Sequence, residues 1–251
     1  MRFGLIGKKL GHSFSKGYFT SKFEQLGLPH QYELFELPEI REFPKLWEQY
    51  PDLHGLNVTI PYKQEVIPYL KTLSPAAAQV GAVNTILKTA DGLVGHNTDI
   101  IGFHQSLLKE LGRFTPTHTL ILGTGGAARA VLYVLREEMK VAHIQAVSRT
   151  PRSGFQGIPV ATYEELDQVD LSYFQLVINT TPLGTYPDVE GHPSIPYARF
   201  DQLEKVWAID LVYNPPFTAF LQKAREYGAH TQNGMDMLIG QAEAAWDIWN
   251  S

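Results

Sequence analysis

The sequence predicts an α/β protein of two domains, and two observations support that prediction. Short apolar runs alternate with amphipathic segments of helix length along almost the whole chain, a pattern typical of mainly parallel sheets covered by helices. The chain has 251 residues, of which 44% are hydrophobic. This is more chain than one domain of common size needs, and it holds enough apolar side chain for two cores.

The first hundred residues contain strand-like and helix-like segments in alternation. Strands are predicted at 3–6, 32–37, 55–58 and 83–87, and helices at 15–26, 43–49 and 61–70. The dipeptide Asp91-Gly92 is a hairpin signal between the apolar runs 84–87 and 93–96. We therefore expect one antiparallel ribbon inside an otherwise parallel sheet.

A second α/β series follows a helix predicted over 99–111. Its strands are predicted at 119–122, 144–147, 176–178 and 206–209, and its helices at 127–138 and 218–227. At the end of the chain, apolar side chains recur at helical spacing on one face: Met235, Leu238, Ile239, Ala242, Trp246 and Trp249. This helix is expected to pack back on the first domain. The predicted domains are thus 1–100 completed by 233–251, and 101–232.

Composition excludes several classes of function. The net charge of −5 gives no broad attraction to nucleic acid or to an anionic membrane. The absence of cysteine excludes disulfides, thiolate catalysis and Cys-ligated metals, and the nine histidines show no HxH or HExxH spacing, so no metal is expected. The opening apolar run is too short for a signal peptide, and no segment approaches the roughly 20 apolar residues of a membrane span. We expect a cytoplasmic protein.

A glycine loop follows the strand at 119–122. Gly123, Gly125 and Ala128 satisfy the GxGxxG/A spacing of dinucleotide-binding folds. The first glycine permits a tight turn, the second lets the backbone approach a pyrophosphate, and the helix N-terminus offers free N–H groups to phosphates. Glycine turns also occur where no ligand binds, but a strand before the loop and a helix after it favour a Rossmann-type nucleotide-binding domain.

The end of the next strand indicates which dinucleotide binds. NAD-binding units usually carry an acidic residue there, which accepts hydrogen bonds from the ribose hydroxyls. Here the position holds Arg149, with Arg152 close by. Guanidinium groups suit a 2′-phosphate, because they form charge-assisted and often bidentate hydrogen bonds. The alternative is a solvated loop with two surface arginines, but the missing acid favours NADP.

Polar clusters follow the predicted strands of the first domain. They contain Ser13 and Ser15, the run 57–63 that ends in Lys63, and the pair Asn84 and Asp99. Loops at the carboxyl ends of parallel strands converge on one crevice. A carbonyl that accepts a hydride becomes an alkoxide and needs a proton donor at hydrogen-bond range, for which lysine is the best placed group, with aspartate to orient it.

Structural explanations exist for the same residues. Most lysines are solvated, and Asp99, Ser13 and Ser15 could each serve as a helix cap. Tyr213 could simply pack under the turn that follows it. Ordered co-occurrence favours a functional site for Lys63, Asp99, Asn84 and the two serines, and leaves both explanations open for Tyr213.

Taken together, these segments resemble the shikimate dehydrogenase family along essentially the whole chain. The resemblance rests on the serine pair, on N-V-T-x-P-x-K at 57–63, on G-A-V-N-T at 81–85 and on G-x-N-T-D at 95–99. Later blocks at 179–184, 210–215 and 234–241 are also similar. The resemblance implies NADPH-dependent, reversible reduction of 3-dehydroshikimate to shikimate, in the pathway to chorismate and the aromatic amino acids.

The resemblance also implies a role for each matching residue. The catalytic pair is Lys63 and Asp99. The residues implied for substrate binding are Ser13, Ser15, Thr59, Asn84, Tyr213 and Gln241. Those implied for NADP binding are Gly123, Thr124, Gly125, Gly126, Ala127, Ser148, Arg149, Thr150, Arg152, Leu211 and Gly234.

Two other functions stay open from the sequence. One is a quinate/shikimate dehydrogenase or a related hydroxy-acid dehydrogenase, although NAD-linked oxidation of quinate usually goes with an acid at the position of Arg149. The other is a non-catalytic nucleotide-binding regulator, which would need neither Lys63 nor Asp99. The expected partner is a small-molecule substrate, without nucleic acid or membrane, for a monomer or a homodimer.

Overall fold

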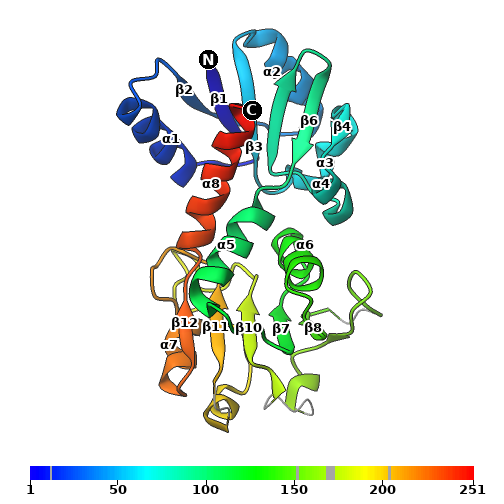
Figure 1. The fold of residues 1–251 in the computed structure, drawn as a ribbon, viewed down its shortest axis with the longest axis vertical. Coiled ribbons are helices and arrows are strands. Elements are labelled where there is room, and N and C mark those ends of the chain that lie inside the picture. The colour runs from blue at the N-terminus through cyan, green and yellow to red at the C-terminus, as the bar shows by residue number, and fades with distance from the viewer. Residues whose placement is uncertain (12, 151–152, 168–172, 203–204) are drawn as a thin grey trace. The chain divides into compact units, whose positions relative to one another are not determined.

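The computed structural model describes residues 1–11, 13–150, 153–167, 173–202 and 205–251 (Figure 1). The chain divides into two compact units, described separately below. Unit 1 comprises Met1–Thr98 and Ala242–Ser251, and unit 2 comprises Asp99–Gln241. Each unit contains one six-stranded sheet with helices, which confirms the α/β class.

The sheet of unit 1 is mixed, with strand order β2-β1-β3-β5-β6-β4. Its strands are β1 (Arg2–Gly7), β2 (Gln31–Glu36), β3 (Leu53–Val58), β4 (Thr72–Leu73), β5 (Thr85–Thr89) and β6 (Gly92–His96). β1 pairs in parallel with β2 and β3, while β5 is antiparallel to both β3 and β6. The predicted hairpin at Asp91-Gly92 is confirmed, and Gly92 has the positive φ, 128°, that favours glycine in such a turn.

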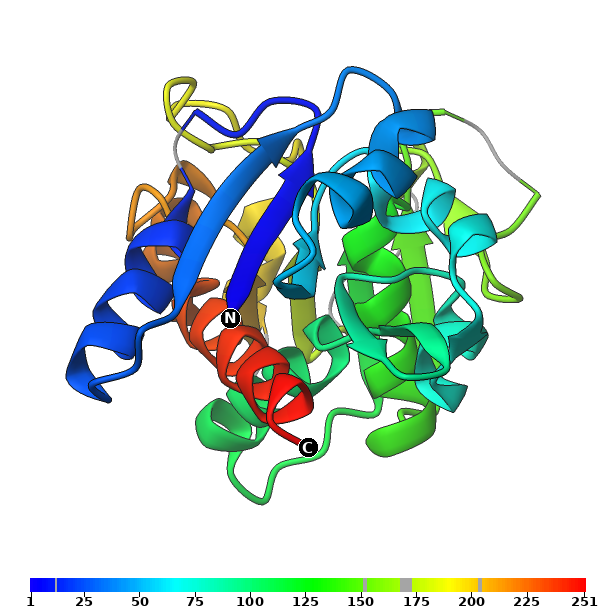
Figure 2. The same cartoon turned by 90° about the horizontal axis from the view of Figure 1, so that it is seen from above.

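Helices and aromatic side chains complete unit 1. The helices are α1 (Phe14–Gln25), α2 (Phe43–Gln49), α3 (Tyr62–Glu65), α4 (Pro75–Val80) and the C-terminal half of α8 (Met235–Trp249). Figure 2 shows that end of α8, in red, alongside β1 in blue. The indole Nε1 of Trp249 donates to the carbonyl oxygen of Ile86, 3.0 Å away. A Cβ at Gly55 would lie 2.3 Å from that nitrogen, so the strand must carry glycine where the indole crosses it.

One predicted helix of unit 1 is wrong. The segment 61–70 forms the single turn α3 and then a 3₁₀ turn, Ile67–Tyr69, rather than one continuous helix. Pro68 has no N–H to bond the carbonyl of Gln64, so an α-helix cannot continue through it. The short elements β4 and α4 were not predicted, because two to six residues are too few to show periodicity.

The sheet of unit 2 is entirely parallel, with strand order β12-β11-β10-β7-β8-β9 (Figure 1). Its strands are β7 (His118–Leu122), β8 (His143–Val147), β9 (Val160–Ala161), β10 (Leu176–Asn179), β11 (Trp207–Asp210) and β12 (His230–Gln232). The central strands are buried along their length, as expected of a parallel sheet covered on both faces. The predictions missed β9 and β12, which are two and three residues long.

The helices of unit 2 begin and end close to the predicted positions. They are α5 (Asp99–Leu111), α6 (Gly126–Tyr133), which a π-helical turn continues over Val134–Glu138, α7 (Ala219–Glu226) and the first part of α8. None of the helices in the described ranges has the length and apolar character needed to cross a membrane.

Candidate functional site

Buried polar side chains meet at one edge of the unit 1 sheet, where β3 and β6 end and β5 begins. Asn84 and Thr98 are 3% and 0% exposed. The Oδ1 atom of Asn84 accepts from the backbone N–H of Thr98 at 2.7 Å, and its Nδ2 donates to the Thr98 hydroxyl at 3.0 Å. The predicted substrate residue Asn84 therefore also fixes the backbone immediately before Asp99.

Two further residues of this cluster were not predicted as site residues. The Tyr32 hydroxyl donates to Oδ1 of Asn57 at 2.7 Å, and Nδ2 of Asn57 donates to the hydroxyl of Thr85 at 3.2 Å. Burial raises the pKa of Tyr32, and a hydrogen bond with Ser15 opposes that rise. Asn57 opens the polar run 57–63 and could have been proposed from it, whereas a tyrosine in a strand gives no such signal.

The serine pair lies at the start of α1. Ser13 is the N-cap, and its Oγ accepts from the backbone N–H of Lys16 at 3.4 Å. The cap explanation is thus correct for Ser13, but it uses only a lone pair. The O–H of Ser13 stays available to donate to a carboxylate, because a hydroxyl can accept and donate at once.

Lys63 lies in the short helix α3 and is half-buried. Its carbonyl oxygen accepts from the backbone N–H of Val83 at 2.7 Å, which brings the Lys63 turn against the segment that carries Asn84. Thr59 follows β3, and its N–H donates to the carbonyl of Ile6 at 2.9 Å. Unit 1 therefore places Thr59, Lys63 and Asn84 on neighbouring segments at one edge of the sheet.

Asp99 and Gln241 belong to unit 2, on α5 and α8. Both are buried, with 8% and 9% exposure. Where these helices cross, a Cβ at Gly102 would lie 2.4 Å from the carbonyl oxygen of Met237 and 2.6 Å from the nitrogen of Gln241. The absence of a side chain at Gly102 thus sets the spacing of the helices that carry Asp99 and Gln241. The pairing of Lys63 with Asp99 stays a prediction.

The glycine loop of unit 2 fits a phosphate ligand. Gly123 has a φ of 110°, which favours glycine. Gly125 is the N-cap of α6 and provides no side chain to cap it, so the first N–H groups of the helix lack a side-chain acceptor. A Cβ at Gly125 or Gly126 would meet nothing within 4 Å. The loop, which also contains Thr124 and Ala127, leaves room for an anion beside these donors.

The residues predicted around the adenosine phosphate follow β8. Ser148 is buried, and its Oγ accepts from the backbone N–H of Thr150 at 3.3 Å. Arg149 is exposed, and its charge partly offsets the rise that burial causes in the pKa of Tyr163. Arg152 lies outside the described residues.

The two residues predicted near the nicotinamide lie together. A Cβ at Gly234 would be 2.1 Å from the carbonyl oxygen of Leu211, so only glycine fits there. The N–H of Gly234 donates to the carbonyl of Val212 at 3.1 Å. Tyr213 comes next in the chain and is half-buried.

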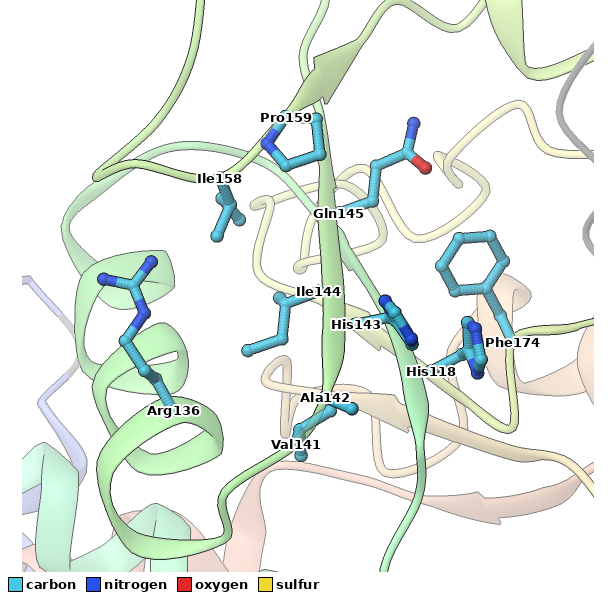
Figure 3. Close-up of a pocket in the computed structure, with 10 residues that line it drawn as sticks. All are labelled: His118, Arg136, Val141, Ala142, His143, Ile144, Gln145, Ile158, Pro159 and Phe174. Atoms are coloured by element: carbon cyan, nitrogen blue, oxygen red, sulfur yellow. The ribbon is translucent and has the colours of Figure 1, made fainter.

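A separate cavity of about 520 Å³ lies at the start of β7 and β8 (Figure 3). His118 and His143 stack there with ring centroids 4.4 Å apart, and burial lowers the pKa of His118. The glycine loop follows the opposite end of β7. Among the described residues, no predicted site residue lines this cavity, so it is not part of the candidate site.

Comparison with known proteins gives the family. Residues 5–86 match the model of the shikimate dehydrogenase substrate binding domain. A shikimate dehydrogenase (NADP(+)) of Clostridium beijerinckii is 38% identical over 98% of this chain and 91% of its own length. The chain belongs to the shikimate dehydrogenase family, as the sequence predicted.

Solved structures agree over nearly the full length. The chorismate mutase/shikimate 5-dehydrogenase fusion protein of Clostridium acetobutylicum superposes with a TM-score of 0.88 at 39% identity, covering 99% of this chain and 90% of that one. Shikimate 5-dehydrogenase of Thermus thermophilus, solved in complex with NADP(H) and shikimate, gives 0.84 at 33% identity, covering 99% and 93%. The Rossmann-type fold predicted for the cofactor domain is that of these relatives.

Proposed function

We propose that this chain catalyses the reversible, NADPH-dependent reduction of 3-dehydroshikimate to shikimate, a step toward chorismate and the aromatic amino acids. One observation carries the proposal. In unit 1, buried neutral amides and hydroxyls gather beside the turn of Lys63, within and next to the residues that match the substrate binding domain. The substrate is a carboxylated ring with hydroxyl groups, and such a ring is bound by neutral donors and acceptors.

The substrate residues divide by the groups they offer. Ser13 and Ser15 bind the carboxylate through their hydroxyls. Thr59, Asn84 and Gln241 contact the carboxylate or the ring hydroxyls, and Tyr213 helps to hold the ring. Unit 1 is the main part of the substrate domain in this proposal, and unit 2 contains the NADP-binding domain.

Lys63 moves the proton. Its Nζ donates a proton to the carbonyl oxygen as that oxygen gains negative charge, and a neutral Lys63 takes the proton back in the oxidation direction. Asp99 orients the ammonium group.

NADPH, when bound, supplies the hydride. The open glycines and uncapped N–H groups at the start of α6 fit its pyrophosphate, with Gly123, Thr124, Gly125, Gly126 and Ala127 as the binding loop. Ser148, Arg149, Thr150 and Arg152 surround the adenosine phosphate. The backbone of Leu211 and Gly234 lies on the nicotinamide side.

Arg149 favours NADP over NAD, and this bears on the alternative substrate. Quinate carries one more hydroxyl, at the carbon that bears the carboxylate, so it must fit near Ser13 and Thr59. The chain has arginine where NAD-linked relatives usually need an acid to bind the ribose hydroxyls. Shikimate with NADP is therefore the preferred pair.

The test is a spectrophotometric assay of the purified chain, which follows nicotinamide absorbance. We expect NADPH oxidation with 3-dehydroshikimate and NADP⁺ reduction with shikimate. Much slower reaction is expected with NAD⁺ or with quinate. Faster turnover of quinate than of shikimate would replace the proposed substrate, and NADPH binding without turnover would indicate a regulator.

A further inference from the structure

A buried carboxylate in unit 2 has no role in the chemistry proposed above. Asp210 ends β11 and is fully buried. Its Oδ1 accepts from Nδ2 of Asn179 at 2.9 Å and from the backbone N–H of Val212 at 3.0 Å, and its Oδ2 accepts from the hydroxyl of Thr218 at 2.5 Å. These donors are all neutral. Burial of an ionised carboxylate costs free energy, and no positive charge offsets that cost among these donors. We therefore expect the carboxylate to have a role at this position.

The donors belong to different loops. Asn179 ends β10, the register neighbour of Asp210 in the sheet. Val212 lies in the loop after β11, and Thr218 is the N-cap of α7. The carboxylate therefore joins the loop after β10, the loop after β11 and the start of α7 at one point.

Through Asn179, the hydrogen bonds of Asp210 lead to the glycine loop. The Oδ1 of Asn179 accepts from the N–H of Thr181 at 3.0 Å and from its hydroxyl at 2.7 Å. The preceding residue, Thr180, donates through its N–H and its hydroxyl to the carbonyl of Leu122. Its Oγ1 would lie 2.7 Å from a Cβ at Gly123. Asn179 thus fixes a turn that packs directly on the first glycine of the loop.

Through Val212, the hydrogen bonds of Asp210 lead to the residues predicted near the nicotinamide. Leu211 lies between Asp210 and Val212, and Asp210 bonds the N–H of Val212. The carbonyl of Val212 accepts from Gly234, whose Cα packs against the carbonyl of Leu211. A shift of the 211–212 backbone would therefore move both Leu211 and Gly234.

We propose that Asp210, with Asn179 and Thr218, is a positioning residue that holds the backbone of Leu211 and Gly234 in the place where the nicotinamide ring binds. The proposal rests on the proposed function. Asp210 does not touch the reacting atoms. It acts through the loops, so its loss should misplace the nicotinamide ring while the adenosine half of the cofactor, held at Arg149 and the glycine loop, binds as before.

The test uses Asp210→Asn in the full chain. The amide has nearly the shape of the carboxylate, but one of its two acceptor oxygens becomes an NH₂ group, which cannot accept from the N–H of Val212 or the hydroxyl of Thr218. Thr218→Val removes the hydrogen bond to Asp210 and the N-cap bond from the N–H of Leu221, but it leaves the carboxylate in place. Val177→Ala, in the apolar core of β10, is the control for destabilisation without a change in the polar cluster.

Three measurements separate positioning from a structural role. We expect kcat to fall about tenfold or more in Asp210→Asn, a range typical of a misplaced reacting group. The primary isotope effect on kcat with 4-deuterated NADPH should rise, because hydride transfer becomes slower than product release. The affinity for 2′,5′-ADP, which carries the adenosine phosphates alone, should change less than twofold. Thr218→Val should show the same pattern at smaller amplitude, and Val177→Ala should lower only the Tm.

A binding measurement keeps this test independent of turnover. The fluorescence of NADPH bound to Asp210→Asn should differ from that of NADPH bound to the wild type, because the nicotinamide environment has changed. The same bound fluorescence with an unchanged isotope effect would overturn the role of Asp210. A wild-type chain that binds NADPH and 2′,5′-ADP but does not turn over 3-dehydroshikimate would overturn the proposed reaction, while the fluorescence comparison would still decide whether Asp210 positions the ring.

Discussion

The two units present their candidate groups in different ways. In unit 1 the groups are side chains, and they are held by one another: Asn84 binds Thr98, and Asn57 links Tyr32 to Thr85. In unit 2 the candidate groups are backbone atoms. Those of the phosphate loop are open at Gly125 and Gly126, whereas Gly234 packs closely against the carbonyl of Leu211. A side-chain site depends on which chemical groups are present, whereas a backbone site depends on volume and on the loops that hold it.

The largest effect is expected at Lys63, the proposed catalytic side chain of unit 1. Lys63→Met keeps the apolar stem and removes the proton donor, so kcat should fall by about 10²–10⁴-fold with little change in KM. Lys63→Arg should rescue poorly, because a guanidinium does not give up its proton. Steady-state kinetics with the exposed Lys45→Met as the control would check this. Near-normal kcat in Lys63→Met would transfer the proton role to another group.

The next effect concerns the charge buried in unit 2. Burial raises the pKa of Asp210 to about 6, against the hydrogen bonds from Thr218, Val212 and Asn179. The carboxyl of Asp210 therefore stays protonated to higher pH in the folded state than in the unfolded chain. The protonated group adds to the free energy of unfolding at low pH, and this contribution is lost as the pH rises from about 4 through about 6. Relative to Asp210→Asn, the wild type should lose about 2 kcal/mol of unfolding free energy between pH 4 and pH 7.

Denaturant unfolding at the two pH values measures that difference. The exposed Asp188→Asn serves as the control, since a solvated carboxylate has no burial cost to lose. If the unfolding free energies of the wild type and Asp210→Asn change in parallel with pH, the carboxylate is not destabilised by burial. The neutral network of unit 1 and the charged network of unit 2 would then not differ in the cost of burying a charge.

A smaller effect is expected for the cofactor phosphate. Arg149→Ala removes charge-assisted hydrogen bonds worth roughly 1.5–3 kcal/mol, so the Kd for NADPH should rise about 10- to 100-fold while the Kd for NADH changes little. Titration of both cofactors checks this, with the exposed Arg225→Ala as the control. Equal losses for NADPH and NADH would show that Arg149 does not contact the 2′-phosphate.

The smallest effect belongs to the serine hydroxyls of unit 1. Ser13→Ala or Ser15→Ala should each raise the KM for shikimate by at least about 2- to 15-fold, since a neutral hydrogen bond contributes about 0.5–1.5 kcal/mol and one to a charged carboxylate more. NADP binding should not change. Ser13→Ala also removes a helix cap. Ser74→Ala removes the equivalent cap of α4, where Oγ accepts from Ala77, and is therefore the control for cap loss alone. Unchanged KM in the double serine variant would place the carboxylate elsewhere.

Sequence periodicity predicted the long elements well and the short ones poorly. The helix expected over 99–111 has those bounds in the structure, because thirteen residues show a clear apolar face. Two- and three-residue strands such as β9 and β12 show no period at all and form only where a neighbouring strand is present. The helix expected over 61–70 failed because Pro68 outweighs a favourable apolar pattern.

The site shows the same division between local and distant information. Motifs marked the groups that we propose to face a ligand, such as Lys63 and the glycine loop, because their spacing is local. The supporting residues were not found, since their partners are remote in the chain: Tyr32 reaches Asn57 across 25 residues, and Asn179 reaches Asp210 across 31. Only the three-dimensional arrangement shows that they act together.

The crossing of α5 and α8 at Gly102 limits which residues of this protein can be changed by engineering. Gln105 and Gly240 also line that crossing, and a Cβ at Gly240 would lie 3.0 Å from the Cα of Gly102. Directed evolution toward a bulkier substrate cannot use these two positions, because one added methyl group would push apart the helices that carry Asp99 and Gln241. Variant libraries should therefore hold Gly102 and Gly240 constant and vary the residues on the open sides of both helices.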